Sequence, residues 1–418
     1  MYFQGKEKNQ STKEKILLAT INASVKQVKN PYSLCNIAKE VGISKPAIFR
    51  YFCCKENLIN AAVSKAFDDI TSAYIQVKNQ YQGDVEKIIQ YFSLWLLTNP
   101  SYLSFVLSNF IIKKDFSSVI VTEFASRGVE LKKDFLSKEG IEEIYVISSI
   151  VTLMSCIFRG HTNFSENSEN QLEEFARKIS SWICYGVPDS YNESKIQYEK
   201  LDELCETAKY QFLEERKKNL QKDENQVKNE TRFFNALAAV VKKHSFSGVT
   251  IENLAEEAGL AKSSLYTWYK NKDDLLQKVI FANFVELKEL LENSFNLVEK
   301  PVEKSYVILK AEMDWLLENI SVLPVVTWLN FSGNGTIKAE EIIFSDSKWA
   351  NDLFDVKNHS KLLSVWMTCL PIPIVLEGCC KGYSREFLKK SVQKIHSMFW
   401  NGILYKNKEN KNEDEIKN

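Results

Sequence analysis

The sequence has few of the residues that interrupt helices. Its 418 residues include only 14 Gly and 8 Pro. Apolar residues recur every three to four positions in many segments, and no convincing run alternates polar with apolar side chains. These features exclude a β-rich or linker-rich chain, and we predict an all-α protein.

Patterns that bind metals or carry out catalysis are missing as well. The chain has four His and nine Cys but no C-x-x-C, and its adjacent pairs, Cys53-Cys54 and Cys379-Cys380, are poorly spaced for zinc. It also lacks a phosphate-binding glycine loop, an H-E-x-x-H motif and a serine elbow. We therefore expect no enzyme activity, no metal and no cofactor. An odd number of Cys without a secretory signal favours reduced thiols and a cytoplasmic protein.

Long apolar runs are limited to two, at residues 144–158 and 362–376. Each is shorter than the roughly 20 residues that cross a bilayer, and the second contains Pro371 and Pro373. We predict core helices and no membrane partner. These helices could line a pocket, or they could form a four-helix seam with the segments ending at Val187 and Ile403. For most of their residues a plain core role is favoured.

The chain repeats itself. Residues 34–43 return as 251–260 and residues 55–58 as 272–275, both 217 positions later. Further landmarks follow in the same order with offsets of 216 to 220: Trp95 and Trp315, Gly160 and Gly378, and residues 179–187 and 395–403. Four matching segments in one order indicate duplication of the whole protein.

This duplication gives a domain plan. Residues 1–5 read as a tag remnant, and residues 407–418 as a polar, disordered tail. Each copy has a helix-turn-helix domain followed by a helical regulatory body. The predicted domains are 6–65 and 66–189 for the first copy, 190–229 for a charged helical linker with a polar hinge near its end, and 230–282 and 283–406 for the second copy.

Charge is unevenly distributed although the formal net charge is zero. Residues 6–60 carry ten Lys/Arg against four Asp/Glu, or +6, and residues 226–280 carry eight against six, or +2. The remainder must therefore sum to −8. Positive charge gathered on the helix-turn-helix segments suits a polyanion, although chance clustering of surface lysines remains the alternative.

Each helix-turn-helix has its own local signals. In the first copy Ser33 and Ser44 are placed to cap successive helices, and Gly42 supplies the turn between them. Pro46 is tolerated in the first turn of the second of these helices. Ile48 and Phe52 lie four residues apart and are expected to face the core.

The segment 43–52 followed by 55–58 resembles the signature of the TetR (tetracycline-repressor-like) family of bacterial transcription regulators, and 260–269 followed by 272–275 is similar again. The match is specific over about 45 residues in each copy and weak in the bodies. The resemblance implies two TetR-like repeats, each with a three-helix DNA-binding head and an all-α ligand-binding and dimerisation body. Together they would form an intrachain pseudo-dimer.

The resemblance also implies site residues. Groove-reading positions and their neighbours are Lys45, Pro46, Ala47, Phe49 and Arg50 in the first head, and Lys262, Ser263, Ser264, Tyr266 and Thr267 in the second. Backbone-contacting positions are Ser33, Tyr51, Lys55, Thr250, Trp268 and Lys272. The chain departs from the family where Phe49 replaces a common Tyr and where Ala261 stands at a capping position.

We therefore expect a ligand-responsive repressor that binds double-stranded DNA as a single-chain pseudo-dimer. Because the two reading helices differ, its operator should be non-palindromic. Its effector would be an apolar or aromatic small molecule, to which no particular residues can be assigned. The alternative is a helical interaction protein derived from such a regulator, with one or both heads inactive. The second head is the weaker candidate because of its poorer cap and lower charge.

Overall fold

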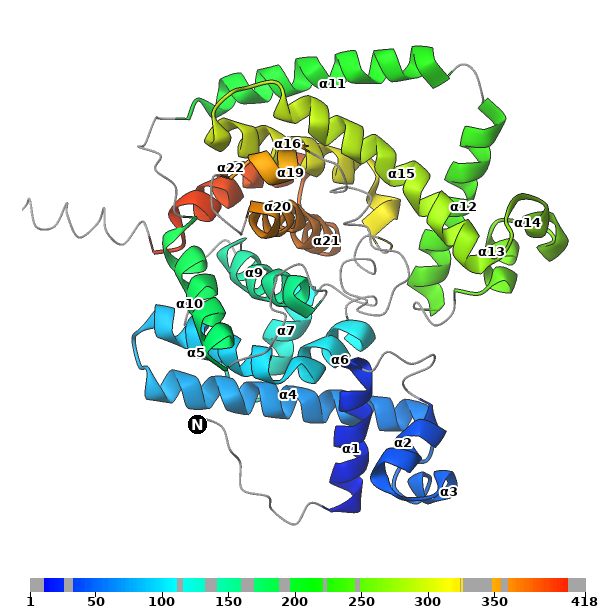
Figure 1. Ribbon diagram of the computed structural model, residues 1–418, viewed down its shortest axis with the longest axis vertical. Coiled ribbons are helices and arrows are strands. Elements are labelled where there is room, and N and C mark those ends of the chain that lie inside the picture. The colour runs from blue at the N-terminus through cyan, green and yellow to red at the C-terminus, as the bar shows by residue number, and fades with distance from the viewer. Residues whose placement is uncertain are drawn as a thin grey trace, which may run out of the picture.

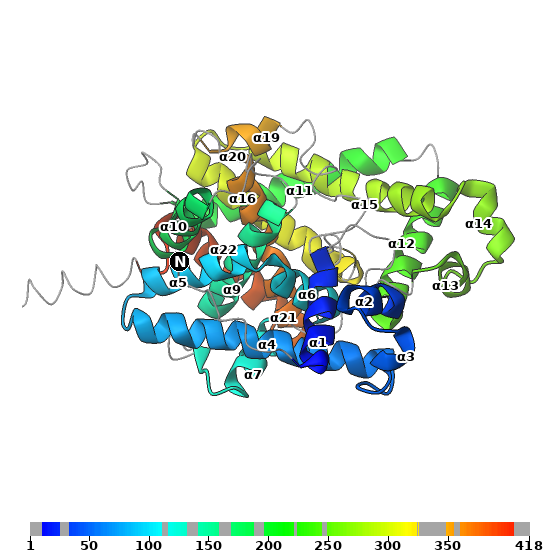
Figure 2. The ribbon, with the colours of Figure 1, turned by 60° about the horizontal axis from the view of Figure 1, so that its bottom comes forward.

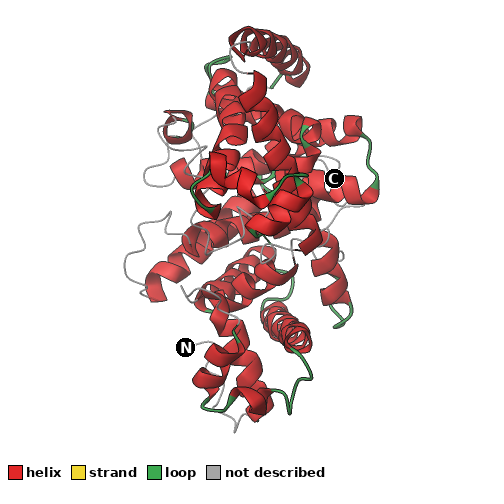
Figure 3. Cartoon of the chain, turned by 90° about the vertical axis from the view of Figure 1, so that its right-hand side faces the viewer, coloured by secondary structure: helices red, strands yellow, loops and turns green. Residues whose placement is uncertain are grey.

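The computed structural model describes residues 11–25, 33–110, 116–131, 141–158, 169–187, 196–220, 224–244, 249–323, 325, 348–354 and 360–404. Every regular element among these residues is helical, and Figure 3 shows no strand in this part of the chain. The all-α prediction is confirmed. The 3-10 turns are η1 (Ala23–Val25) and η3 (Ile320–Val322).

The helices of the first copy are α1 (Thr12–Asn22), α2 (Leu34–Val41), α3 (Lys45–Ile48), α4 (Lys55–Gln80), α5 (Val85–Thr98), α6 (Pro100–Phe110), α7 (Phe116–Ala125), α9 (Ile141–Phe158) and α10 (Glu169–Tyr185). The remaining helices are α11 (Tyr198–Leu220), α12 (Glu224–His244), α13 (Ile251–Glu257), α14 (Lys262–Trp268), α15 (Lys272–Phe295), α16 (Pro301–Glu318), α19 (Lys348–Asp352), α20 (Ser360–Cys369), α21 (Pro371–Lys381) and α22 (Arg385–Asn401).

Helices α4 and α15 begin at lysines 217 residues apart, and each runs without a break from a helix-turn-helix into a body. The domain boundaries expected at 65/66 and 282/283 therefore fall inside continuous helices. The two heads lie at the right-hand side of both Figure 1 and Figure 2, the first around α3 and the second around α14.

The second apolar run is two helices and not one. α20 ends at Cys369 and α21 begins at Pro371, because a proline ring clashes with the preceding turn and lacks the N–H that would continue the helix. By length and hydropathy the combined stretch Ser360–Lys381 could cross a membrane, but 78% of its apolar window is buried within the protein. It lies in the interior of the molecule in Figure 1, as expected of a core helix.

The two copies meet where α10 and α22 end. The backbone N–H of Val187 donates to the carbonyl of Phe399 at 3.1 Å, and the N–H of Ile403 donates to the carbonyl of Ile183 at 3.0 Å. Val187 and Ile403 are 216 positions apart, as are Ile183 and Phe399, so each copy makes the same bond to the other. The two backbone hydrogen bonds are therefore reciprocal between segments that lie 216 positions apart in the chain.

Two glycines allow this close approach. Gly186 (φ 83°) and Gly402 (φ 74°) have the left-handed backbone that glycine tolerates best. A Cβ atom on Gly186 would lie 2.0 Å from the carbonyl oxygen of Trp400, and one on Gly402 would lie 2.2 Å from that of Cys184. The crossing therefore requires glycine on both sides.

Aromatic side chains extend the seam inward. Trp366 of α20 stacks on Trp182 of α10, with ring centroids 6.3 Å apart, and packs against Phe399 of α22 at 4.7 Å. The hydroxyl of Tyr145 on α9 donates to the carbonyl of Met398 at 3.1 Å. The apolar helices thus contribute to a seam between the copies, one of the two roles expected of them.

The connecting helix α11 is docked on the second body. Its Tyr198 hydroxyl lies 3.0 Å from Nδ1 of His396, and its Asp202 accepts from the Tyr306 hydroxyl at 2.7 Å. His396 is fully buried, and burial lowers its pKa to about 4. In Figure 1, α11 runs along the top of the molecule from the α22 end toward the second head.

The described residues of the hinge expected at 217–225, namely 217–220 and 224–225, are helical, and residues 221–223 lie outside the described part of the chain. α11 continues to Leu220 and α12 begins at Glu224, six residues before the expected start of the second head. The Lys, Gln, Glu and Leu residues of this segment have high helix propensity, which outweighs its polarity. The predicted tag remnant and tail lie outside the described residues.

Gly186→Ala and Gly402→Ala should each destabilise the protein by about 2 kcal/mol more than Gly83→Ala, because only the first two also drive a methyl group into a backbone carbonyl. Gly83 is the matched control: its φ is 80°, and a methyl group added there would meet no atom within 4 Å. Urea unfolding of the three variants measures the difference. Equal costs at all three positions would contradict the tight crossing.

Candidate nucleic-acid interface

The first head is a compact three-helix unit with its own small core. Ile48 and Phe52 are buried there with Ile16, Ile37 and Leu58, as their spacing predicted. α2 ends at Gly42, whose φ of 74° makes the left-handed turn into α3. Ile43 closes this turn by donating its N–H to the carbonyl of Ala38 at 3.0 Å.

Both capping hydrogen bonds predicted for this head are missing. Ser33 and Ser44 occupy the N-cap positions of α2 and α3, but neither hydroxyl accepts a capping hydrogen bond. For Ser44 the reason is local: Pro46 at the second helical position has no N–H, and the N–H of Ala47 bonds to the Ser44 carbonyl at 2.9 Å. We find no comparable reason at Ser33.

The predicted reading side of the first head is open. Lys45, Pro46, Phe49, Arg50, Tyr51 and Lys55 are exposed, while Ser33 and Ala47 are half-buried. The aromatic rings of Phe49 and Tyr51 are 45% and 43% exposed, unusually high for side chains of that size. An exposed Lys, an Arg and two aromatic rings on one short helix and its flank suit contact with a duplex groove and its phosphates.

The second head has the same plan, and α13, the first helix of its helix-turn-helix, has a better N-cap than α2. Thr250 accepts from the N–H of Asn253 at 3.1 Å, whereas Ala261 leaves α14 without a side-chain cap, as predicted. Its exposed predicted residues are Lys262, Ser263, Tyr266, Thr267 and Trp268, and its half-buried ones are Ser264 and Lys272.

Three polar groups of the second head are already engaged within the protein. Lys262 forms an ion pair with Glu252 on α13. Lys272 donates to the carbonyl of Val249 at 3.0 Å, and the Thr267 hydroxyl donates to that of Ser264 at 2.6 Å. The second head thus offers DNA fewer free donors than its sequence suggested.

Glu252 was not identified from the sequence as a site residue. It corresponds to Cys35 in the first head, 217 positions earlier, and this comparison could have revealed it. The hydrogen bond with Lys262 lowers the pKa of Glu252, and the same bond raises the pKa of Lys262. A carboxylate that holds the first lysine of the reading helix disfavours phosphate approach.

Arg232 of α12 is a further residue that sequence reasoning missed. Its Nε donates to the carbonyl of Ala258 at 2.7 Å and its Nη2 to that of Gly259 at 3.2 Å. Arg232 therefore stabilises the turn between α13 and α14. Beside it, Phe233 meets the ring of Trp268 edge to face at 5.7 Å, which orients that exposed indole.

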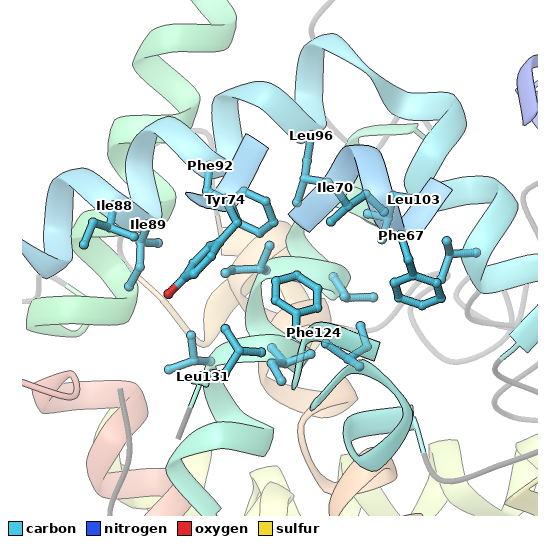
Figure 4. Close-up of a pocket in the computed structure, with 16 residues that line it drawn as sticks. Phe67, Ile70, Tyr74, Ile88, Ile89, Phe92, Leu96, Leu103, Phe124 and Leu131 are labelled. Atoms are coloured by element: carbon cyan, nitrogen blue, oxygen red, sulfur yellow. The ribbon is translucent and has the colours of Figure 1, made fainter. Parts of the chain in front are cut away.

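The first body contains an apolar pocket of about 80 Å³ (Figure 4). Its wall combines α4, α5, α6, α7 and α9 with Leu131. The lining residues are Phe67, Ile70, Tyr74, Ile88, Ile89, Phe92, Leu96, Leu103, Val106, Ile120, Phe124, Leu131, Val146, Ile147, Ile150 and Val151. The first apolar helix therefore serves both the pocket and the seam, the two roles left open by the sequence.

Two comparisons bear on identity. Residues 234–279 match the sequence profile of the family described as bacterial regulatory proteins, tetR family. The chain is also 25% identical over 189 residues to the uncharacterized HTH-type transcriptional regulator YxbF of Bacillus subtilis (strain 168). That match covers 42% of this chain, which spans about half (47%) of the relative's length. Both findings support a DNA-binding transcription regulator.

Glu252→Gln should strengthen binding to a random-sequence duplex and steepen its salt dependence by about 0.9 in log–log slope, because Lys262 becomes free to neutralise one more phosphate. Glu256→Gln on the same helix removes an equal charge and is the control. Fluorescence anisotropy at several salt concentrations measures both. The same slope change in the two variants would mean that only overall charge matters.

Proposed function

We propose, from the premise that the chain is a tetR-family DNA-binding transcription regulator and not an enzyme, that it works as a single-chain pseudo-dimer on a non-palindromic operator. In this proposal it is a cytoplasmic repressor, and an apolar small molecule releases it from double-stranded DNA. The observation that carries the proposal is the reciprocal crossing of α10 and α22, which pairs the two copies within one polypeptide.

The positions of the heads support simultaneous binding. Both lie on one side of the molecule in two views (Figures 1 and 2), and the side chains expected to read bases are exposed in each, apart from the half-buried Ala47 and Ser264. A dimeric helix-turn-helix protein places its reading helices about one DNA turn apart, on half-sites related by its symmetry. A fused pair meets the same requirement without a second chain.

The difference between the heads supports an asymmetric operator. Arg50 of the first head corresponds to Thr267 of the second, and Ala47 corresponds to Ser264. Arginine pairs well with guanine, whereas the Thr267 hydroxyl is bonded to its own helix. Fusion also holds the two heads at an effective concentration near millimolar, so binding should not weaken through subunit dissociation.

The pocket supports ligand responsiveness. Phe67, Ile70 and Tyr74 belong to α4, the helix that begins at Lys55 beside the first reading helix. At roughly 1.5 Å per residue this helix is about 39 Å long, so a small tilt at the pocket moves its head end appreciably. A ligand that favours one tilt shifts the population of DNA-competent heads.

A second candidate function is favoured by the ion pair at Glu252. With Lys262 and Lys272 both engaged, the second head could have lost base reading and kept only a structural role. The chain would then be an interaction protein derived from a regulator, or a regulator with one active head.

Selection from a random DNA pool should return two unlike half-sites separated by about one helical turn. Lys45→Ala and Arg50→Ala should each cost about 1–3 kcal/mol of base discrimination, confined to one half-site. A symmetric motif would contradict the unlike heads, and a single half-site would favour the second candidate.

Sedimentation showing a two-chain species at micromolar concentration would contradict the single-chain unit.

Benzene should raise the thermal midpoint of the wild-type protein and weaken its binding to the selected DNA, because a dry apolar cavity accepts a small aromatic ligand. Ile150→Trp, which places an indole in the pocket, should abolish both effects. Ile75→Trp, at an exposed position of α4 outside the pocket lining, is the matched control. Stabilisation without any change in DNA affinity would contradict the coupling.

A further inference from the structure

The second body places an acid where the first body has a pocket wall. Phe92 lines the apolar pocket on α5, and at the offset of 220 that relates Trp95 to Trp315 it corresponds to Glu312 on α16. Two other residues of the pocket wall are matched by the same residue type at this offset: Ile88 corresponds to Ile308, and Leu96 corresponds to Leu316.

Glu312 lies on the same face of α16 as Ile308 and Leu316, because residues four apart point in one direction on a helix. Both neighbours are buried, with exposures of 0% and 1%, and Glu312 is 4% exposed. The α5 residues that line the first pocket are therefore matched on α16 by apolar residues at two positions and by a carboxyl in place of a phenyl ring at the third.

This carboxyl has no partner within the described residues. Its Oε2 is buried without a hydrogen bond, and among those residues neither oxygen forms an ion pair. The charged residues two positions to either side do not neutralise it: Lys310 and Asp314 bond to each other at 2.8 Å, and Lys389 approaches Asp314 at 3.3 Å. Burial raises the pKa of Glu312 well above its usual value.

A buried acid without a partner is costly, and a ligand that completes its hydrogen bonds is one explanation for keeping such a group in a folded protein. The missing partner can be inferred from the surroundings. The neighbouring side chains on this face are apolar, so the bulk of the ligand is apolar. A carboxyl group pairs most strongly with a cationic donor, which forms a charge-assisted hydrogen bond.

We propose that Glu312 is the anchoring residue of a second ligand site, specific for a small organic ammonium ion with an apolar body. Resting on the proposed function, this would give one chain two effector sites of different chemistry, an apolar one in the first body and a cation-selective one in the second. On binding, the Glu312 carboxyl transfers its proton to solvent, and the carboxylate pairs with the ligand ammonium.

Calorimetric titration of the full chain at pH 7 with benzylamine and with its neutral analogue benzyl alcohol tests the site. Benzylamine should bind at least about tenfold more tightly than the alcohol. Titrations in two buffers of different ionisation enthalpy should show about one proton released per benzylamine and none per benzyl alcohol. Equal or tighter binding of the alcohol, or no heat from benzylamine, would overturn the proposal.

Glu312→Gln should remove both the preference for the amine and the proton release. Glu386→Gln, at an exposed position of α22, should retain both. A preference that survives in Glu312→Gln overturns the assignment to this residue. If that variant does not fold, the comparison of amine with alcohol on the wild type still decides the proposal. The affinity of the wild-type protein for DNA is measured separately, in the absence of amine. If the protein does not bind DNA but still prefers benzylamine, the proposed regulatory function is refuted and the ligand site is not.

Discussion

The arrangement depends on one backbone contact, the crossing of α10 and α22 at Gly186 and Gly402. At this point two chain segments approach so closely that a single methyl group on either glycine would overlap a carbonyl of the other copy. The reciprocal hydrogen bonds fix the rotation of one copy against the other, and the tryptophans of the seam fill the space that this rotation creates.

The proposed single-chain pseudo-dimer lacks a constraint of a homodimer. In a homodimer each substitution appears twice, whereas two related segments of one chain can differ from each other. The heads illustrate this, because Glu252 holds Lys262 while the corresponding Cys35 offers Lys45 no carboxylate. The bodies illustrate it as well, since the position of Phe92 in an apolar wall carries a buried acid in the second copy. One scaffold thus presents two surfaces and two interiors of different chemistry.

Continuous helices connect each head to a body. α4 and α15 each join a head to a body without a break, and α11 is docked across the second body through Tyr198 and Asp202. The first head keeps a separate small core, whereas the core of the second is continuous with that of the bodies. The first head is therefore joined to its body mainly through α4, whose residues Phe67, Ile70 and Tyr74 also line the pocket.

The sequence by itself determined the helical class and the local plan of each head, because helical periodicity, the turn glycine and the spacing of Ile48 and Phe52 are encoded by near neighbours. Sequence reasoning overlooked that Pro46 deprives Ser44 of its capping donor and that Pro371 divides the second apolar helix, although both reasons are local. Only the tertiary structure decided that Gly186 lies against the backbone of Trp400 and Gly402 against that of Cys184. It also decided that Glu252 engages Lys262 and that Glu312 has no partner among the described residues. These outcomes depend on distances between residues remote in the chain, which no pattern of spacing contains.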